Sequence, residues 1–154
     1  MLTEHGIARW IAAGFGTGFA PVAAGTVASA VATVAGAALL WWSPLALLVA
    51  VPVVTFGGLW AVRAARVEGD PGWVAIDEFA GQWIALLGLA AVTPLGLLAA
   101  FALFRFLDIT KLGPVGWADR QHGAAGIMAD DLIAGALTGG ILWAVRSRWP
   151  GALG

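Results

Sequence analysis

The fold is decided by the stretch TVASAVATVAGAALLWWSPLALLVAVPVVTFGGLWAV, residues 26–62, which contains no charged side chain. One membrane-spanning helix needs about 20 apolar residues, so this stretch is long enough for two. The tetrapeptide Trp-Trp-Ser-Pro at 41–44 divides it and combines residues typical of a membrane interface and of a turn. We therefore expect spans over residues 26–42 and 44–62, with Pro52 as a kink.

The overall composition agrees with an integral membrane protein. Of the 154 residues, 60% are hydrophobic and 11% are charged, whereas about a quarter are charged in a typical soluble domain. The net charge of −1 provides no basic surface, so we expect no nucleic-acid partner. The chain has no cysteine, which excludes a disulfide framework and a thiolate metal site.

Further segments complete the predicted helix bundle. Residues 1–21 are interpreted as an interfacial segment by which the chain enters the membrane, together with the start of a Gly-rich loop. The charge-free residues 79–104 are interrupted by a Thr-Pro pair, which predicts two short helices. Residues 132–149 form the last apolar segment. We expect one all-α domain over residues 1–154, a small polytopic membrane bundle of about four to five transmembrane or re-entrant helices.

The basic residues predict the orientation of this bundle. If the spans alternate in direction, only Arg146 and Arg148 lie on one side, and the other side receives Arg9, Arg63, Arg66, Arg105, Lys111 and Arg120. Cytoplasmic loops carry an excess of Lys and Arg, so the second side is predicted to face the cytoplasm. The same side receives every carboxylate, which predicts a cytoplasmic-side active site.

Five carboxylates are predicted to meet at that surface. Asp77 and Glu78 begin one helix, Asp108 ends another, and Asp130 and Asp131 begin the last. Such a cluster repels itself unless a cation lies within it, and oxygen ligands without Cys or His neighbours are typical of Mg²⁺. Taken singly, each pair is also explained by helix capping and by the helix dipole.

Positive charge lies beside these acids. Arg105, Asp108 and Lys111 are spaced three apart and share one helical face, an arrangement that fits a metal held next to a phosphate. We therefore interpret residues 104–131 as a catalytic loop region. His122 in this region is a weaker candidate for a phosphate donor, because a surface position in a Gly-rich loop explains it equally well.

A Gly-rich stretch near the N-terminus offers a second hypothesis for phosphate binding. Residues 14–25 contain four glycines, and Thr26 follows at a predicted helix start. Backbone N–H groups of such a turn can bind an oxyanion. The alternative, which the spacing alone favours, is close helix packing or a simple turn.

Four blocks of the sequence resemble those of the phosphatidylglycerophosphatase A family and occur in the same order: GFGTGFAPVAAGT at 14–26, DEFAGQW at 77–83, FRFLDITK at 104–111 and DRQHGAAGIMADDLIAG at 119–135. The resemblance implies a multi-pass enzyme of the bacterial cytoplasmic (inner) membrane. Such an enzyme uses Mg²⁺ to remove the terminal phosphate of phosphatidylglycerophosphate, which gives phosphatidylglycerol. Ala24, Leu112 and the Gly-Ala pair at 123–124 depart from the family pattern but leave every candidate charged group in place.

The acidic residues of the family motifs match the five carboxylates. From this resemblance we predict Glu78, Asp108 and Asp131 as Mg²⁺ ligands, with Asp77 and Asp130 as further ligands or as neighbours of the ligands. One spare carboxylate would act as the base toward water. Attack by an aspartate, which would form a phosphoenzyme, stays open as the alternative chemistry.

The basic residues of the motifs match Arg105, Lys111 and Arg120. We predict that these three, with His122 and Thr26, bind the phosphate of the substrate. The expected partners are the phospholipid substrate and membrane lipid, and the sequence leaves open whether the chain forms a homo-oligomer.

Two other functions remain open at this point. The chain could act on another lipid phosphate monoester, which turnover on several lipids would show. It could also be a small membrane cation transporter, in which carboxylates form a path through the bilayer. The gathering of the charges on one side argues against that path.

Overall fold

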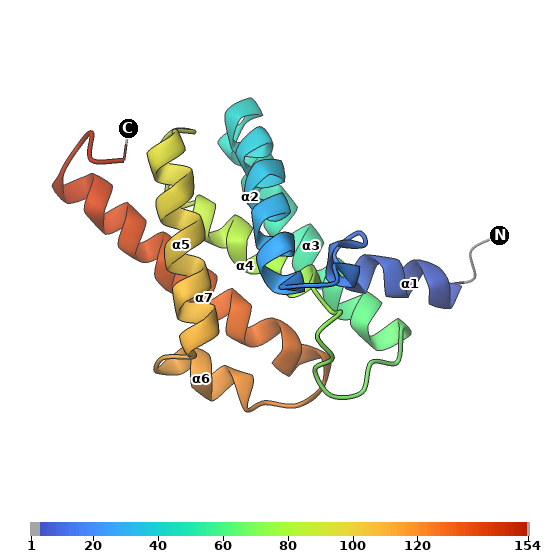
Figure 1. The fold of residues 1–154 in the computed structure, drawn as a ribbon. Helices are drawn as coiled ribbons and strands as arrows, with labels where there is room; N and C mark the ends of the chain where they lie inside the picture. Colours follow the sequence, from blue (N-terminus) through green and yellow to red (C-terminus); the bar gives the residue numbers. More distant parts are fainter. Residues whose placement is uncertain (1–3, 154) are drawn as a thin grey trace.

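The computed structural model describes residues 4–153, and all regular structure in this range is helical, as the sequence predicted. Figure 1 shows the helices in chain order. They are α1 (Glu4–Ala12), the short 3-10 helix η1 (Thr17–Phe19), α2 (Ala24–Trp42), α3 (Pro44–Ala64), α4 (Ile76–Leu86), α5 (Pro94–Thr110), α6 (Pro114–Asp119) and α7 (Gly123–Arg148). Residues 1–3 of the predicted interfacial segment 1–21 lie outside the described residues.

Within residues 4–153, three helices are long and apolar enough to cross a membrane, namely α2, α3 and α7. The predicted spans over residues 26–42 and 44–62 agree with α2 and α3 to within two residues at each end. The predicted break near residue 93 is also confirmed. Thr93 caps α5 by accepting a hydrogen bond from the Gly96 N–H, and Pro94 occupies the first turn. Helices α4 and α5 on either side of the break are the two short helices.

The start of the last helix differs from the prediction. Helix α7 begins at Gly123, seven residues before Asp130, which was expected to begin it, so Asp130 and Asp131 lie inside the helix rather than at its N-terminus. The first turns contain small residues that pack closely, and Gly126 lies against the backbone of Gln121. Packing therefore overrides the low helix propensity of glycine here. The interpretation of residues 104–131 as a loop region is wrong, because α5, α6 and α7 cover most of it.

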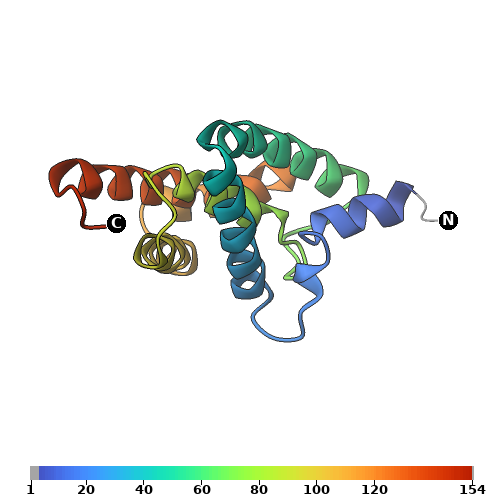
Figure 2. The same ribbon diagram turned by 90° about the horizontal axis from the view of Figure 1, so that it is seen from above.

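Helix α4 lies at the centre of the molecule and packs against α2, α3, α5 and α7. Figures 1 and 2 together show α2 and α5 on one side of α4, with α7 running alongside α4 and passing behind α5. The tightest approach joins α4 to α7. A Cβ atom added to Gly135 would meet the carbonyl oxygen of Gly81, so only small residues allow this contact. The consequence is that the acidic residues near the start of α4 lie next to those of α7.

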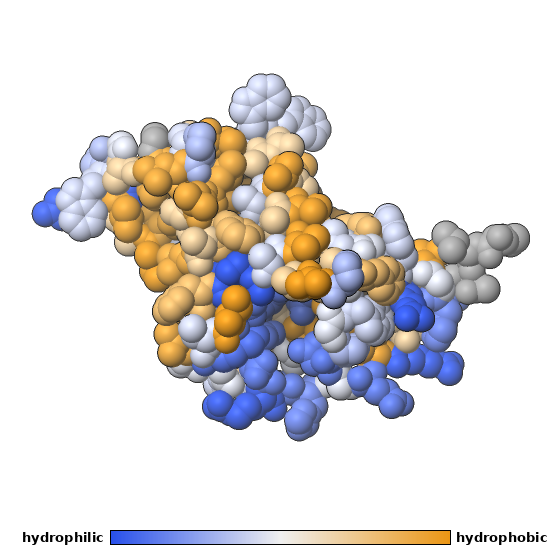
Figure 3. Space-filling view, in the orientation of Figure 1, coloured by the Kyte–Doolittle hydropathy of each residue, from blue (hydrophilic) through white to orange (hydrophobic). Residues whose placement is uncertain are grey.

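The surface separates into an apolar part and a polar part. Figure 3 shows hydrophobic residues over α2, α5 and the adjoining length of α7, and hydrophilic residues gathered at the end that carries α6 and the loops. Large apolar side chains such as Val34, Trp41 and Phe56 are exposed on the apolar part. This distribution is that of a helix bundle surrounded by lipid, with one polar end.

Candidate active site

Three buried carboxylates meet inside the polar end. Glu78 lies in the first turn of α4, Asp108 in the last turn of α5 and Asp131 inside α7. One oxygen atom from each residue lies within 4.8 Å of the other two. All three residues are at most 7% exposed. Buried acids at this separation repel one another, so the arrangement needs positive charge nearby.

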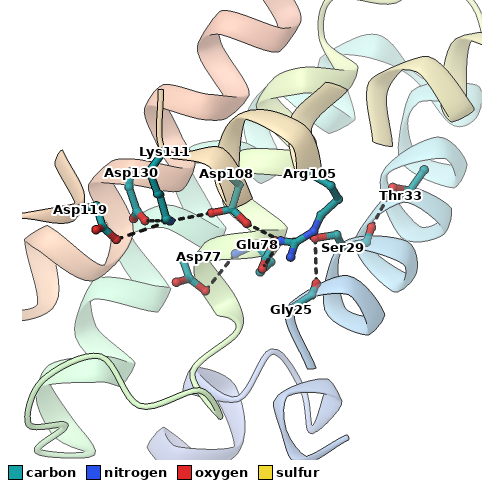
Figure 4. Close-up of polar contacts among 10 residues, drawn as sticks. All are labelled: Gly25, Ser29, Thr33, Asp77, Glu78, Arg105, Asp108, Lys111, Asp119 and Asp130. Atoms are coloured by element: carbon teal, nitrogen blue, oxygen red, sulfur yellow. Dashed lines mark hydrogen bonds and ion pairs between the residues drawn. The ribbon is translucent and has the colours of Figure 1, made fainter. Parts of the chain in front are cut away.

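Arg105 supplies part of that charge. Its Nη1 atom donates to Glu78 Oε1 at 2.6 Å and to Asp108 Oδ2 at 2.5 Å (Figure 4). Arg105 and Asp108 lie three residues apart on α5, so the predicted shared helical face is confirmed. The guanidinium group therefore bridges α4 and α5 at the site.

Lys111 supplies a second positive charge, just beyond the last turn of α5. It adopts a left-handed conformation (φ 51°), and its Nζ lies 2.8 Å from Asp108 Oδ1, 2.5 Å from Asp130 Oδ2 and 3.6 Å from Asp119 Oδ1. Burial opposes the charged form, but the hydrogen bonds to Asp108 and Asp130 outweigh it and raise the pKa of Lys111 above its ordinary value. Lys111 thus stays protonated and joins α5, α6 and α7.

Ser29 of α2 is a site residue that the sequence analysis missed. Its hydroxyl is fully buried and lies 2.5 Å from Glu78 Oε2, to which it donates. The same hydroxyl lies 2.9 Å from the carbonyl oxygen of Gly25. Ser29 therefore holds the oxygen of Glu78 that Arg105 does not contact. A signal was present in the sequence, since Ser29 and Thr33 place two hydroxyls on one face of an otherwise apolar span.

A hollow of about 290 Å³ opens beside the cluster at the polar end of the molecule. Asp130 lines it together with Asp70, Asp119, Gln121 and His122. Partial burial, followed by the negative charge of Asp130, raises the pKa of Asp70 above its ordinary value. Asp130 is the link between the hollow and the cluster, because Lys111 contacts both Asp130 and Asp108, whereas Glu78, Asp108 and Asp131 do not line the hollow.

Comparison with known proteins decides the family. The family model described as Phosphatidylglycerophosphatase A matches residues 10–146. The chain belongs to the phosphatidylglycerophosphatase A family. The family resemblance noted in the sequence is thereby confirmed.

Three relatives cover most of the chain. It is 37% identical over 145 residues to phosphatidylglycerophosphatase A of Escherichia coli (91% of this chain, 84% of that protein) and 32% identical over 141 residues to phosphatidylglycerophosphatase A of Haemophilus influenzae (88% and 86%). It is also 39% identical over 153 residues to a protein of Bacteroides thetaiotaomicron whose name gives phosphatidylinositol-3-phosphatase as a provisional activity (90% and 92%). No solved structure matches.

The other predicted site residues differ in whether they contact this cluster. Asp77 accepts a hydrogen bond from the Glu78 N–H at 3.0 Å, in the first turn of α4. His122 is exposed and lines the hollow. Arg120 is exposed at the end of α6, and within residues 4–153 neither its side chain nor that of Thr26 takes part in a hydrogen bond or an ion pair. The geometry thus connects Asp130 and Lys111 to the cluster, but not Thr26 or Arg120.

Residues 14–20 of the Gly-rich stretch before α2 form a hydrogen-bonded turn. The N–H groups of five of its residues donate to carbonyl oxygens within or next to the turn; these residues are Gly14, Thr17, Gly18, Phe19 and Ala20. Gly14 and Gly16 have positive φ angles of 58° and 94°, which glycine adopts readily. The interpretation as a turn therefore describes residues 14–20. Gly25, at the end of the same stretch, lies against Glu78 and Arg105, and phosphate binding by this stretch stays a prediction.

The donor set suits the cation that the family resemblance implies. Glu78, Asp108 and Asp131 offer only carboxylate oxygens. Arg105 and Lys111 pair with Glu78 and Asp108, but within residues 4–153 no basic side chain forms an ion pair with Asp131. Hard oxygen donors at this separation match the preference of Mg²⁺. The site combines an oxygen cage, two fixed cations and a polar hollow, which together can bind and activate a phosphate ester.

Proposed function

We propose that this protein hydrolyses the terminal phosphate monoester of phosphatidylglycerophosphate to give phosphatidylglycerol. Family membership supports the proposal, and two of the relatives carry that activity in their names. The observation that carries it is the group of three buried carboxylates within 4.8 Å, contacted by Arg105 and Lys111. A phosphate monoester carries two negative charges near neutral pH, so its hydrolysis requires concentrated positive charge.

We assign Glu78, Asp108 and Asp131 as the residues that would hold Mg²⁺. When bound, the ion supplies positive charge against the phosphoryl oxygens and favours formation of the attacking nucleophile. Arg105 and Lys111 bind the remaining phosphate oxygens. Both already contact Asp108, so they are oriented before the substrate arrives, which lowers the cost of reorganisation during the reaction.

The proton of the attacking water needs an acceptor. Asp130 lines the hollow and contacts Lys111, whereas Asp77 accepts a backbone hydrogen bond within α4. Asp130 is therefore the better placed of the two spare carboxylates to act as the base. In the alternative chemistry an aspartate attacks the phosphorus, and trapping of a phosphorylated aspartate would establish it.

The proposed orientation places the polar end at the cytoplasmic face of the bacterial inner membrane. Six of the eight basic residues are expected on that side, in agreement with the positive-inside rule. The acyl chains of the substrate then stay in the bilayer while its head group reaches the carboxylates, and inorganic phosphate leaves into the cytoplasm.

A second candidate substrate is an inositol lipid. The Bacteroides relative is 39% identical over 92% of its own length, as similar to this chain as the Escherichia coli protein. The names of both relatives specify a phosphate monoester on the polyol head group of a phospholipid as the substrate. Both reactions would use the same cluster.

Phosphate release by the detergent-purified protein tests these proposals. We expect Mg²⁺-dependent release from phosphatidylglycerophosphate that EDTA abolishes, and slower release from phosphatidylinositol 3-phosphate. Release from the inositol lipid alone would favour the second candidate. If folded protein releases phosphate from neither lipid, the phosphatase proposal fails, and cation flux in liposomes becomes the next measurement.

A further inference from the structure

A shallow groove runs between α2 and α5 on the apolar surface of the molecule. Its volume is about 280 Å³, and it is lined by Ala30 and Thr33 of α2 and by Leu97, Leu98 and Phe101 of α5. Thr33 is the one lining residue with a polar side chain, and its hydroxyl donates to the carbonyl oxygen of Ser29 within the helix. The groove therefore presents an apolar surface to the surrounding lipid.

The groove leads to the carboxylate cluster. On α2, Ser29 lies four residues before Thr33, and on α5, Arg105 lies four residues after Phe101. Residues four apart share a helix face and lie about 6 Å from each other along the axis. One turn along each wall, the apolar lining is thus replaced by residues that contact Glu78.

The figures agree with this continuity. Figure 4 shows Ser29 and Arg105 converging on Glu78 from α2 and α5, with Thr33 further along α2. Figure 3 shows a hydrophilic patch at the surface between the apolar surfaces of these two helices. The side chain of Arg105 is 13% exposed, so the cluster is not sealed off from the outside.

We propose that this groove seats an acyl chain of the lipid substrate, so that the head group enters the site sideways from the bilayer. The inference rests on the proposed phosphatase function. The groove is apolar, and cationic and metal-binding groups follow within one helical turn. A phospholipid has the same sequence of parts, an apolar chain followed by a charged head group.

The groove would act by orientation rather than by affinity. A chain that leaves the bilayer for the groove exchanges one apolar surrounding for another, so little hydrophobic free energy is gained. Its contribution is to hold the glycerol backbone at a defined distance from the carboxylates. Such positioning can change a rate by about tenfold to a hundredfold without any new polar contact.

Filling the groove tests the proposal. Ala30→Trp places a large side chain in it, and Val31→Trp is the matched control, because Val31 is 44% exposed and points about 100° away around the same helix. Each variant is assayed with Mg²⁺ on phosphatidylglycerophosphate carrying two C16 chains and on the same head group carrying two C4 chains. We expect Ala30→Trp to lower kcat/KM for the long-chain lipid by about tenfold or more and to change the short-chain value by less than about twofold. Val31→Trp should behave as wild type on both.

Three outcomes separate the possibilities. An unchanged long-chain value overturns the groove assignment, and so does an equal loss on both lipids, which would report damage to the site. Absence of phosphate release by the folded wild-type protein on either lipid refutes the phosphatase function instead. If Ala30→Trp does not fold, Leu98→Trp fills the groove from its other wall.

A measurement that does not depend on turnover completes the test. A phosphatidylglycerophosphate analogue with a diazirine in its acyl chain is irradiated with wild-type protein, and the adducts are mapped by mass spectrometry. We expect adducts within residues 30–33 and 97–101. Adducts spread evenly over the exposed face of α3 would show that the groove holds no chain in preference to bulk lipid and would overturn the proposal.

Discussion

Replacing Ser29 by Ala removes a hydroxyl that contacts Glu78 and lies outside the predicted set of phosphate-binding residues. Ser29 Oγ lies 2.5 Å from Glu78 Oε2, while Arg105 occupies Oε1. Within residues 4–153, the Ser29 hydroxyl is the one hydrogen-bond donor to Oε2. The change therefore leaves one oxygen of a buried carboxylate without its donor. Of the two side-chain contacts that orient the Glu78 carboxylate, the one with Arg105 remains.

The size of the effect follows from this contact. A hydrogen bond to a charged group contributes about 1.5–3 kcal/mol. At about 1.4 kcal/mol for each factor of ten, this corresponds to roughly a 10- to 150-fold change in an equilibrium constant. Loss of a residue that orients a metal ligand typically weakens metal binding by about 10- to 100-fold, which agrees. We expect the Mg²⁺ concentration for half-maximal activity to rise by about that factor, with a much smaller loss at saturating Mg²⁺.

The assay is phosphate release from phosphatidylglycerophosphate over a range of Mg²⁺ concentrations. Thr33→Val is the matched control, because it removes a hydroxyl one turn away on the same face of α2 that lies 2.8 Å from a backbone carbonyl and does not contact Glu78. Thermal unfolding in detergent shows whether each variant is folded.

Two results would refute the reasoning. If folded Ser29→Ala shows the Mg²⁺ dependence of the wild type, then Glu78 either is not a ligand or is oriented without Ser29. If Thr33→Val shifts the Mg²⁺ dependence equally, the cause is the packing of α2 and not the hydrogen bond.

Further changes test the site and its supporting packing. Asp108→Asn should lower kcat/KM at least about a hundredfold in a folded protein, because both site cations lose a charged partner; activity near wild type would contradict the ligand assignment. Gln82→Met should raise the unfolding temperature, since within residues 4–153 both amide atoms of Gln82 are buried without a partner, a cost of about 1–3 kcal/mol; a lower unfolding temperature would contradict this. Gly135→Ala should destabilise the fold by about 1–3 kcal/mol, because its Cβ would meet the Gly81 carbonyl. Gly140→Ala points into open space and should leave the unfolding temperature unchanged, so equal unfolding temperatures for the two variants would refute the close contact.

Much of the fold was predictable because hydropathy and helix capping are local properties. Residues 26–62 carry no charge and contain a turn at Ser43 and Pro44, and the structure places α2 and α3 on either side of it. The Thr93 cap ends one apolar segment and starts the next for the same reason. Length and local chemistry suffice for such predictions, since lipid leaves the chain few structures other than helices.

The sequence also indicated which charged residues belong together, but not their contacts. Glu78 and Asp108 lie at helix ends, as expected. Asp131 joins them from inside α7, because that helix already starts at Gly123. Close packing of its first turns outweighs the low helix propensity of the glycines there. The family resemblance already favoured Glu78 over Asp77 as a ligand. The structure places Glu78 in the cluster with Asp108 and Asp131, whereas Asp77 accepts a hydrogen bond from the Glu78 N–H.

Contacts between distant segments were decided by the tertiary structure alone. Ser29 and Glu78 are 49 positions apart, and nothing local to either residue specifies that they meet. They meet because α2 packs directly on α4, where Gly25 lies against Glu78 Oε1 and the indole N–H of Trp83 donates to the carbonyl oxygen of Ala32. The sequence by itself determined a membrane helix bundle with its acids at one end. Packing of small residues between helices decided which acids face one another, because helix-to-helix distances depend on side chains from two segments at once.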